Sequence, residues 1–288
     1  IVPFCILYAR ERLNNTVRSR KDIEEFINAP ILGEIPHFTG IANLGFAVKE
    51  DGRDSISEAF RMLRFNMSFI NKDARVIMLT STMPGEGKTF ISGNFAATLG
   101  ITGKKVVLVD ADIRKRTRSR LMSMDKTLGL TSYLSGSVDD VRSLIVTKNK
   151  ECNLDFLPAG IMAPNPAELL MTGRLEQCIE DLKKYYDYIV IDNVPAQAVA
   201  DAGIVNRVAD FTIYVLRETK IDRRFLPELE RLHQEKIFNH LCIVINDSRA
   251  KTKKYGYGYG YGYGYGYGYG RAEEKSRWKK LFSRKKDV

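Results

Sequence analysis

The chain has 288 residues, of which 44% are hydrophobic and 28% charged, and its formal net charge is +10. This composition is typical of a soluble globular protein that can bury one sizeable α/β core. The four cysteines form no C-x-x-C pair and the three histidines are scattered, which excludes a zinc-finger spacing and a disulfide-rich scaffold. The basic excess leaves phosphates, a membrane surface or nucleic acid as anionic partners to consider.

The first residues form an apolar run that is followed by basic residues. Positions 1–9 carry no charge, and five arginines or lysines lie between positions 10 and 21. Nine residues cannot cross a bilayer, which needs about 20. Two interpretations stay open: the cytosolic end of a membrane span followed by positive-inside residues, which we favour, or a buried N-terminal strand. No charged region precedes the run, so it is not a signal peptide.

The next residues predict little regular structure until an amphipathic helix begins. We expect a short helix over 22–28, an extended segment fenced by prolines over 30–36, and a loop over 37–54. A helix is predicted over 57–70, because its apolar residues recur at three- and four-residue steps: Phe60, Leu63, Met67 and Ile70.

One face of the predicted 57–70 helix is charged. Glu58, Arg61 and Arg64 follow one another at three-residue steps, so they form a single stripe. Taken alone, such a stripe indicates no more than a solvated face.

A glycine-rich stretch at residues 81–89 is the strongest chemical signal in the chain. It reads Ser-Thr-Met-Pro-Gly-Glu-Gly-Lys-Thr and lies between an apolar, β-rich run and a helical run. A turn of this kind points backbone N–H groups at one spot at a helix N-terminus, where an anion is favoured. Lys88 would contact the β- and γ-phosphates of a nucleotide, and the Thr89 hydroxyl would hold Mg²⁺.

From Arg75 onward, predicted strands and helices alternate, which favours a mostly parallel sheet with helices on both faces. The strand segments are near-continuous apolar runs, as expected of strands buried on both sides. Strands are predicted at 75–81, 105–111, 154–158, 188–193, 211–216 and 241–246. Helices are predicted at 88–101, 138–147, 166–184, 201–208 and 225–236.

Two of these strands end in aspartates. Asp110 and Asp112 follow one apolar strand, and Asp192 ends another. Ligands of open α/β sheets bind outside the carboxyl ends of the strands, so these acids are expected to converge on the glycine-rich loop. There Asp192 would hold Mg²⁺, directly or through water. One of Asp110 and Asp112 would assist the metal while the other accepts a hydroxyl proton.

The chain after the last predicted strand has a different composition. Residues 255–270 are Tyr-Gly repeated eight times, and such a segment is expected to lack a fixed structure. Residues 271–288 hold eight basic and three acidic side chains. Trp278, Leu281 and Phe282 have the spacing of an interfacial helix, although a merely soluble basic tail stays an open alternative.

In their order and spacing, these segments resemble the bacterial tyrosine kinases that control capsule and exopolysaccharide export. Residues 84–89 are similar to the Walker A motif of that family, 109–114 to its Walker A′ motif and 189–192 to its Walker B motif. Glu58, Arg61 and Arg64 match the family's E-x-x-R-x-x-R motif, and the Tyr-Gly segment resembles its tyrosine cluster.

The resemblance implies an α/β P-loop NTPase fold with a disordered Tyr-rich tail, in three parts. Residues 1–36 would be a membrane-exit and juxtamembrane segment from a fused polysaccharide copolymerase domain. Residues 37–250 would be the kinase domain, and 251–288 the Tyr-Gly cluster and basic tail. The expected location is the cytoplasmic face of the bacterial inner membrane.

The resemblance also implies an ATP- and Mg²⁺-dependent kinase with assigned residues. Lys88, Asp110 and Asp112 would be catalytic, and Thr89, Asp112 and Asp192 would bind the metal. The nucleotide would be bound by Pro84, Gly85, Glu86, Gly87, Lys88, Thr89, Phe90 and Asn246, with Asn246 near adenine. The phosphoacceptors would be Tyr255, Tyr257, Tyr259, Tyr261, Tyr263, Tyr265, Tyr267 and Tyr269.

The implied partners follow from the same family. Glu58, Arg61 and Arg64 would support a ring homo-oligomer, with an octamer as one candidate size, in which tails are phosphorylated in trans. The polysaccharide polymerisation and export machinery, a tyrosine phosphatase and the membrane are further expected partners, and nucleic acid is not. The alternative is a MinD/ParA-like ATPase switch. Met83 argues against it, since partitioning-type relatives carry a signature lysine there.

Overall fold

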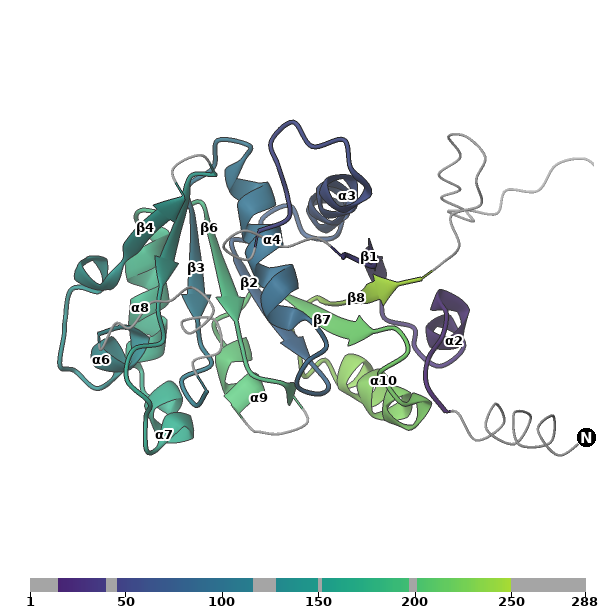
Figure 1. Ribbon diagram of the computed structural model, residues 1–288. Helices are drawn as coiled ribbons and strands as arrows, with labels where there is room; N and C mark the ends of the chain where they lie inside the picture. Colours follow the sequence, from purple (N-terminus) through teal and green to yellow (C-terminus); the bar gives the residue numbers. More distant parts are fainter. Residues whose placement is uncertain (1–14, 40–45, 116–127, 150–151, 197–200, 250–288) are drawn as a thin grey trace, which may run out of the picture. The chain divides into compact units, whose positions relative to one another are not determined.

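The computed structural model describes residues 15–39, 46–115, 128–149, 152–196 and 201–249. In these ranges one sheet has the strand order β1-β8-β7-β2-β6-β3-β5-β4 (Figure 1), and every pair is parallel except β4 with β5. The strands are Ile31–Pro36 (β1), Val76–Ser81 (β2), Val106–Asp110 (β3), Val146–Asn149 (β4), Leu154–Leu157 (β5), Tyr188–Asp192 (β6), Phe211–Arg217 (β7) and Leu241–Ser248 (β8).

Helices cover both faces of this sheet. Their bounds are Arg20–Glu24 (α2), Ser55–Ile70 (α3), Lys88–Gly100 (α4), Leu130–Leu134 (α6), Pro166–Met171 (α7), Arg174–Lys183 (α8), Asp201–Asn206 (α9) and Leu226–Gln234 (α10). Single 3-10 turns span Val141–Leu144 (η2) and Arg223–Phe225 (η4). The helices α3 and α4 share one apolar cluster with the sheet, and the remaining α-helices share another on the opposite face.

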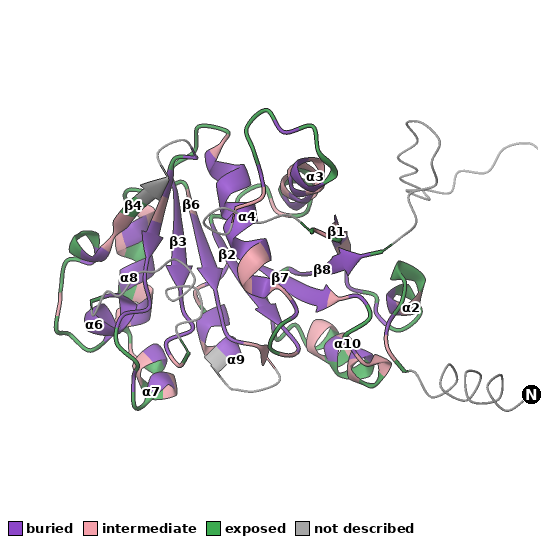
Figure 2. Ribbon diagram, viewed as in Figure 1, coloured by how far each residue is buried: buried purple, intermediate pink, exposed green. Residues whose placement is uncertain are grey.

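Alternate side chains along each strand pack into one or the other of these two clusters. In β2, Val76 and Met78 belong to the cluster under α8 and α9, whereas Ile77 and Leu79 belong to the cluster under α3 and α4. Successive strand residues point to opposite faces, so a strand covered on both sides must be apolar throughout. Figure 2 shows the central strands buried and the outer sides of α3 and α10 exposed.

The helix that carries the charged stripe begins with a cap that its sequence dictates. The Oδ1 atom of Asp54 accepts hydrogen bonds from the backbone N–H groups of Ile56 and Ser57, at 3.1 and 2.9 Å. Such a cap satisfies N–H groups that have no partner within the helix. The apolar stripe of α3 then packs on β1, where a Cβ on Gly33 would lie 2.7 Å from Leu63 Cδ2.

Most predicted elements are confirmed, with three corrections. The short helix predicted over 22–28 lies earlier, at Arg20–Glu24, because Ser19 and Asp22 form a capping box at its start. The helix predicted over 138–147 is wrong: Asp140 caps only the η2 turn, and the β-branched residues Ile145, Val146 and Thr147 lead into β4, which pairs with β5. The helix predicted over 166–184 is two helices, α7 and α8. The chain is extended at Thr172, with ψ 151°, so the first helix ends there.

The described part of the predicted juxtamembrane segment belongs to the sheet unit. Residues 31–36 form β1 beside β8, and Val17 is buried, with its N–H donating to the Ile221 carbonyl at 2.9 Å. None of the helices in the described ranges has the length and apolarity needed to cross a bilayer. The apolar run 1–9, the tyrosine cluster and the basic tail lie outside the described residues.

Candidate active site

The glycine-rich loop joins the end of β2 to the start of α4. Gly85 and Gly87 have φ values of +82° and +91°, in the left-handed region that L side chains rarely adopt. A Cβ on Gly87 would also overlap the Asn246 amide nitrogen. The turn therefore requires both glycines. It delivers the N-terminus of the 13-residue helix α4 to the carboxyl edge of the sheet.

Lys88 and Asp192 meet at this edge. The Lys88 Nζ atom lies 2.6 Å from Asp192 Oδ1, and the side chains are 9% and 2% exposed. The contact follows from the topology, because β6, which ends in Asp192, is hydrogen-bonded to β2, which leads into the loop. The predicted P-loop cation and strand-end carboxylate are thus brought together.

The other two carboxylates follow the neighbouring strand β3. Asp110 is the register partner of Asp192 and is fully buried. Its Oδ1 accepts the backbone N–H of Asp112 at 3.2 Å, and Asp112 in turn accepts the N–H of Lys115 at 3.0 Å. Asp110 therefore supports the turn that follows β3, and both carboxylates are buried, with Asp112 7% exposed.

A cavity of about 290 Å³ opens over these residues. Its walls include the predicted residues Lys88, Thr89 and Asp112. Five further lining residues had no assigned role in the sequence: Ser81, Arg114, Lys115, Val194 and Pro195. The cavity combines a helix N-terminus with basic side chains and one carboxylate, which is the environment that a bound phosphate chain and a proton-accepting group require.

The donor set at this edge fits Mg²⁺. Thr89, Asp112 and Asp192 offer a hydroxyl and carboxylate oxygens, the hard ligands that this ion prefers. Within the described residues no group of three His, Cys, Asp or Glu side chains forms a closed metal cage. Mg²⁺ typically binds through one or two carboxylates together with substrate phosphates and waters, so an open donor set is the expected one.

Glu86 lies inside the loop rather than on its surface. The side chain is fully buried, and its Oε2 atom accepts the backbone N–H of Met83 at 2.7 Å. Its Oε1 atom has no hydrogen-bond partner among the described residues. Burial raises the pKa of this carboxyl to about 7, in spite of the N–H donors around it.

Two residues of the predicted nucleotide-binding set have other contacts as well. Asn246, at the end of β8, donates from Nδ2 to the Glu86 carbonyl at 2.8 Å. The Phe90 ring packs against Phe38 and Phe60, with ring centroids 5.8 and 6.2 Å apart. Asn246 thus lies against the loop, and the adenine contact stays a prediction.

The charged stripe of α3 makes contacts within the chain. Glu58 and Arg61 form an ion pair, and Arg61 donates to the Glu50 carbonyl at 2.9 Å. Arg64 donates to the Thr98 carbonyl in α4 at 3.1 Å. The first two side chains remain 45% and 30% exposed, so their charged ends are accessible to another molecule.

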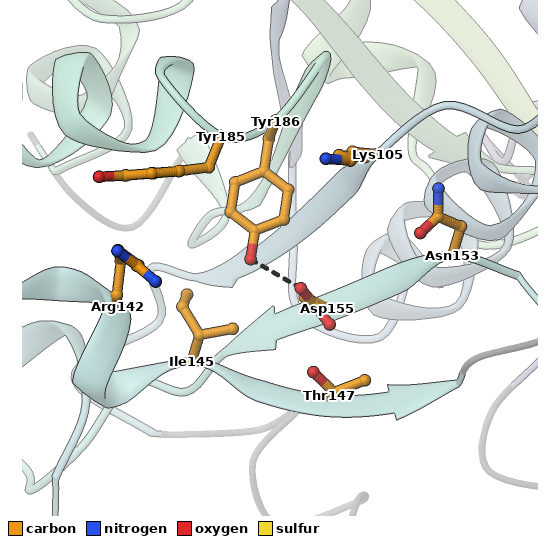
Figure 3. Close-up of a pocket in the computed structure, with 8 residues that line it drawn as sticks. All are labelled: Lys105, Arg142, Ile145, Thr147, Asn153, Asp155, Tyr185 and Tyr186. Carbon is orange, nitrogen blue, oxygen red and sulfur yellow. Dashed lines mark hydrogen bonds between the residues drawn. The ribbon is translucent and has the colours of Figure 1, made fainter.

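A second cavity, of about 390 Å³, lies at the opposite edge of the sheet (Figure 3). It is lined by residues just before β3, β5 and β6, including Lys105, Asn153 and Tyr186. Tyr186 donates to Asp155 at 2.7 Å, and the Arg142 guanidinium lies 4.8 Å from the Tyr185 ring centroid. None of the predicted site residues lines this cavity.

Comparisons with known proteins find relatives that are named tyrosine-protein kinases. The AAA domain family matches residues 74–217. The chain is 34% identical over 199 residues to tyrosine-protein kinase CpsD of Streptococcus pneumoniae, which covers 69% of this chain and 87% of that protein. It is 33% identical over 177 residues to tyrosine-protein kinase etk of Escherichia coli, which covers 61% of this chain and 24% of that protein.

The fold comparison points to the same family. The kinase domain of Escherichia coli tyrosine kinase ETK matches with a TM-score of 0.71 and 27% identity, covering 84% of this chain and 100% of that domain. The matched region is 29% of a Klebsiella pneumoniae relative, so the chain spans about a quarter of the length of such long relatives. With its P-loop and its three strand-end aspartates at one edge of the sheet, the chain belongs to the bacterial tyrosine kinases of capsule and exopolysaccharide loci.

Proposed function

We propose that this chain transfers the γ-phosphoryl group of ATP to tyrosines of its own C-terminal cluster, in trans within a ring of copies. The single observation that carries the proposal is the convergence, at one edge of the sheet, of the P-loop, of Asp112, which lines the cavity, and of Asp192, which pairs with Lys88. Phosphoryl transfer needs positioning and charge neutralisation rather than covalent chemistry, and this edge supplies both.

Each residue has a role in this proposal. The loop N–H groups and Lys88 bind the phosphates, and Thr89 and Asp192 hold Mg²⁺, which neutralises charge on the β- and γ-phosphates when bound. Asp112 lines the cavity, so it is the residue that accepts the tyrosine hydroxyl proton. The bond from the tyrosine oxygen to phosphorus forms as the bond to the ADP oxygen breaks. Asp110 holds Asp112 in place through its backbone N–H.

The cellular role is proposed from the relatives. We infer that the chain is the cytosolic kinase part of a membrane-associated protein and that the exposed Glu58 and Arg61 contact the next copy in the ring. Phosphorylation of the tail would regulate the polysaccharide polymerisation and export machinery, and a tyrosine phosphatase would reverse it. The support is the printed names of relatives as tyrosine-protein kinases, one of them in a cps region.

A mixing experiment tests both the reaction and its direction. A tagged Lys88→Met chain is incubated with Mg-ATP and an untagged active chain whose eight cluster tyrosines are replaced by phenylalanine. Mass spectrometry and an anti-phosphotyrosine blot should then show phosphotyrosine on the tagged chain only. An unmodified tagged chain, beside an active full-length control, would exclude transfer in trans. An inactive full-length control would exclude the kinase assignment.

A further inference from the structure

Three side chains, from the end of β7, the turn that follows it and the end of β8, donate hydrogen bonds to three consecutive carbonyls of the P-loop. Lys220 Nζ donates to the Pro84 carbonyl at 2.9 Å, and Arg217 donates to the Gly85 carbonyl at 3.2 Å. The third donor is the Asn246 amide, which lies 2.8 Å from the Glu86 carbonyl. None of the motifs found in the sequence predicts this arrangement.

These contacts determine where the loop N–H groups point. The carbonyl and the N–H of one trans peptide plane point in opposite directions. Holding the carbonyls of residues 84, 85 and 86 on the side of β7 and β8 therefore turns the N–H groups of residues 85, 86 and 87 to the other side. Within the described residues, none of these three N–H groups donates to a protein acceptor.

Arg217 is itself held in place. Its Nε atom donates to Asp247 Oδ2 at 3.0 Å, and the other carboxylate oxygen of Asp247 pairs with His37 at the end of β1. Asp247 is only 6% exposed. Burial raises its pKa, but the hydrogen bonds from His37 and Arg217 outweigh that effect and hold it below its usual value, so the acceptor stays ionised.

We propose that Arg217 and Lys220 are positioning residues that orient the P-loop N–H groups for the phosphates of a nucleotide, and that Asp247 orients Arg217. The proposal rests on the proposed function only in taking a nucleotide as the ligand. A preorganised loop binds more tightly because the ligand does not bear the cost of ordering it. Neither residue lines the phosphate cavity, which separates this role from direct contact with the transferred group.

Titration of Mg-ADP into the full chain by calorimetry tests the proposal. One net hydrogen bond is equivalent to roughly a fivefold change in affinity. Arg217→Met and Lys220→Met should therefore each raise the Kd roughly fivefold. Lys220→Gln, which keeps an N–H donor without the charge, should recover most of the loss. Arg224→Met is the matched control, because that exposed cation in the nearby η4 turn pairs, among the described residues, only with Asp222, and it should leave the Kd unchanged.

Three outcomes would overturn the proposal. A Kd unchanged in both methionine variants would do so, and so would equal losses in Lys220→Met and Lys220→Gln, which would indicate attraction by charge alone. Hydrogen exchange provides the third measurement: at equal occupancy by Mg-ADP, whose phosphates are the expected acceptors, the amides of residues 85–87 should exchange faster in the methionine variants than in the control. Equal exchange would show that the loop does not depend on these contacts. Because Mg-ADP binding is the readout, a chain that makes no phosphotyrosine would still decide the question.

Discussion

The Lys88 ammonium and the Asp192 carboxylate neutralise each other at a separation of 2.6 Å in a buried position. Removing one charge takes the ion-pair partner from the other in a buried position, a change that costs about 3 kcal/mol or more in comparable sites. Lys88→Met should therefore abolish phosphotyrosine formation and also lower the free energy of unfolding. The double variant Lys88→Met with Asp192→Asn should regain stability but not activity. Denaturant unfolding would measure the stability, and an anti-phosphotyrosine blot would measure the activity. A single variant as stable as the parent would contradict the buried pair.

The two aspartates after β3 should differ in their effect on the rate. Asp112→Asn removes the proton acceptor that lines the cavity, and loss of such a group typically costs about 10²- to 10⁴-fold. Asp110→Asn keeps an oxygen that accepts the Asp112 N–H, so the loss should be smaller. Single-turnover phosphorylation with saturating Mg-ATP measures both rates. A larger loss of rate in Asp110→Asn than in Asp112→Asn would show that Asp110, not Asp112, is the proton acceptor.

Replacing Glu58 and Arg61 by alanine should weaken self-association more than it weakens the fold. Their ion pair is exposed and contributes only about 0–1 kcal/mol within one chain. Arg64 is left intact, because it donates to the Thr98 carbonyl and helps to hold α3 on α4. Light scattering should show a lower oligomer mass at an unchanged melting temperature. If the variant has the same oligomer mass as the parent, these charges form only a solvated face and do not support self-association.

The stability of the domain should fall with pH because of Glu86. Its pKa is about 7 in the folded protein against an ordinary value of 4.5, so the folded chain keeps a proton that the unfolded chain releases between these values. The free energy of unfolding therefore decreases as the pH rises through this window. Glu86→Gln should be more stable than the parent at pH 8, by on the order of 2–3 kcal/mol.

The same comparison supplies its own control. Near pH 4.5 both states of the parent can hold the proton, so the two proteins should unfold at similar denaturant concentrations there. A difference in stability that does not change between pH 5 and 8 would show that Glu86 does not titrate in this range.

Phosphorylation of the tail should cause the proposed oligomer to dissociate. Each phosphotyrosine adds about −1.5 to −2 charges at pH 7, so eight add about −12 to −16, against a formal +10 for the whole chain. Crowded tails would repel each other, and more strongly at low salt, where screening is weak. Light scattering of phosphorylated and phosphatase-treated chain at two salt concentrations measures this. A fully phosphorylated oligomer that persists at low salt would exclude repulsion as the cause.

The sequence predicts the sheet and its catalytic edge well, for a physical reason. Strands buried on both faces are continuous apolar runs, so β2, β3 and β6 are found within one residue of their bounds. Because parallel strands end at one edge, the acids that follow them had to converge with the P-loop. The convergence of Lys88 with Asp192 needs no information beyond strand order.

Other features depend on contacts that no local pattern encodes. The apolar spacing around Ile145 suits a helix, but pairing with β5 favours a strand there. Arg217 and Lys220 lie 132 and 136 residues from the carbonyls that they hold, and each looks like an ordinary surface cation in the sequence. Their role becomes visible only when the ends of β7 and β8 are placed beside the loop.

The pairing of β1 with β8 determines how late in synthesis the domain can complete its fold. The first strand of the sheet, 31–36, has its partner at 241–248, so a nascent chain carries Leu32 and Ile35 without a neighbouring strand until nearly the whole domain has left the ribosome. Helix α3 packs on β1, so it cannot complete its packing before β1 is paired. In the proposed ring, assembly through α3 would therefore be restricted to chains whose final strand is already in place, and prematurely terminated chains would be kept out of the oligomer.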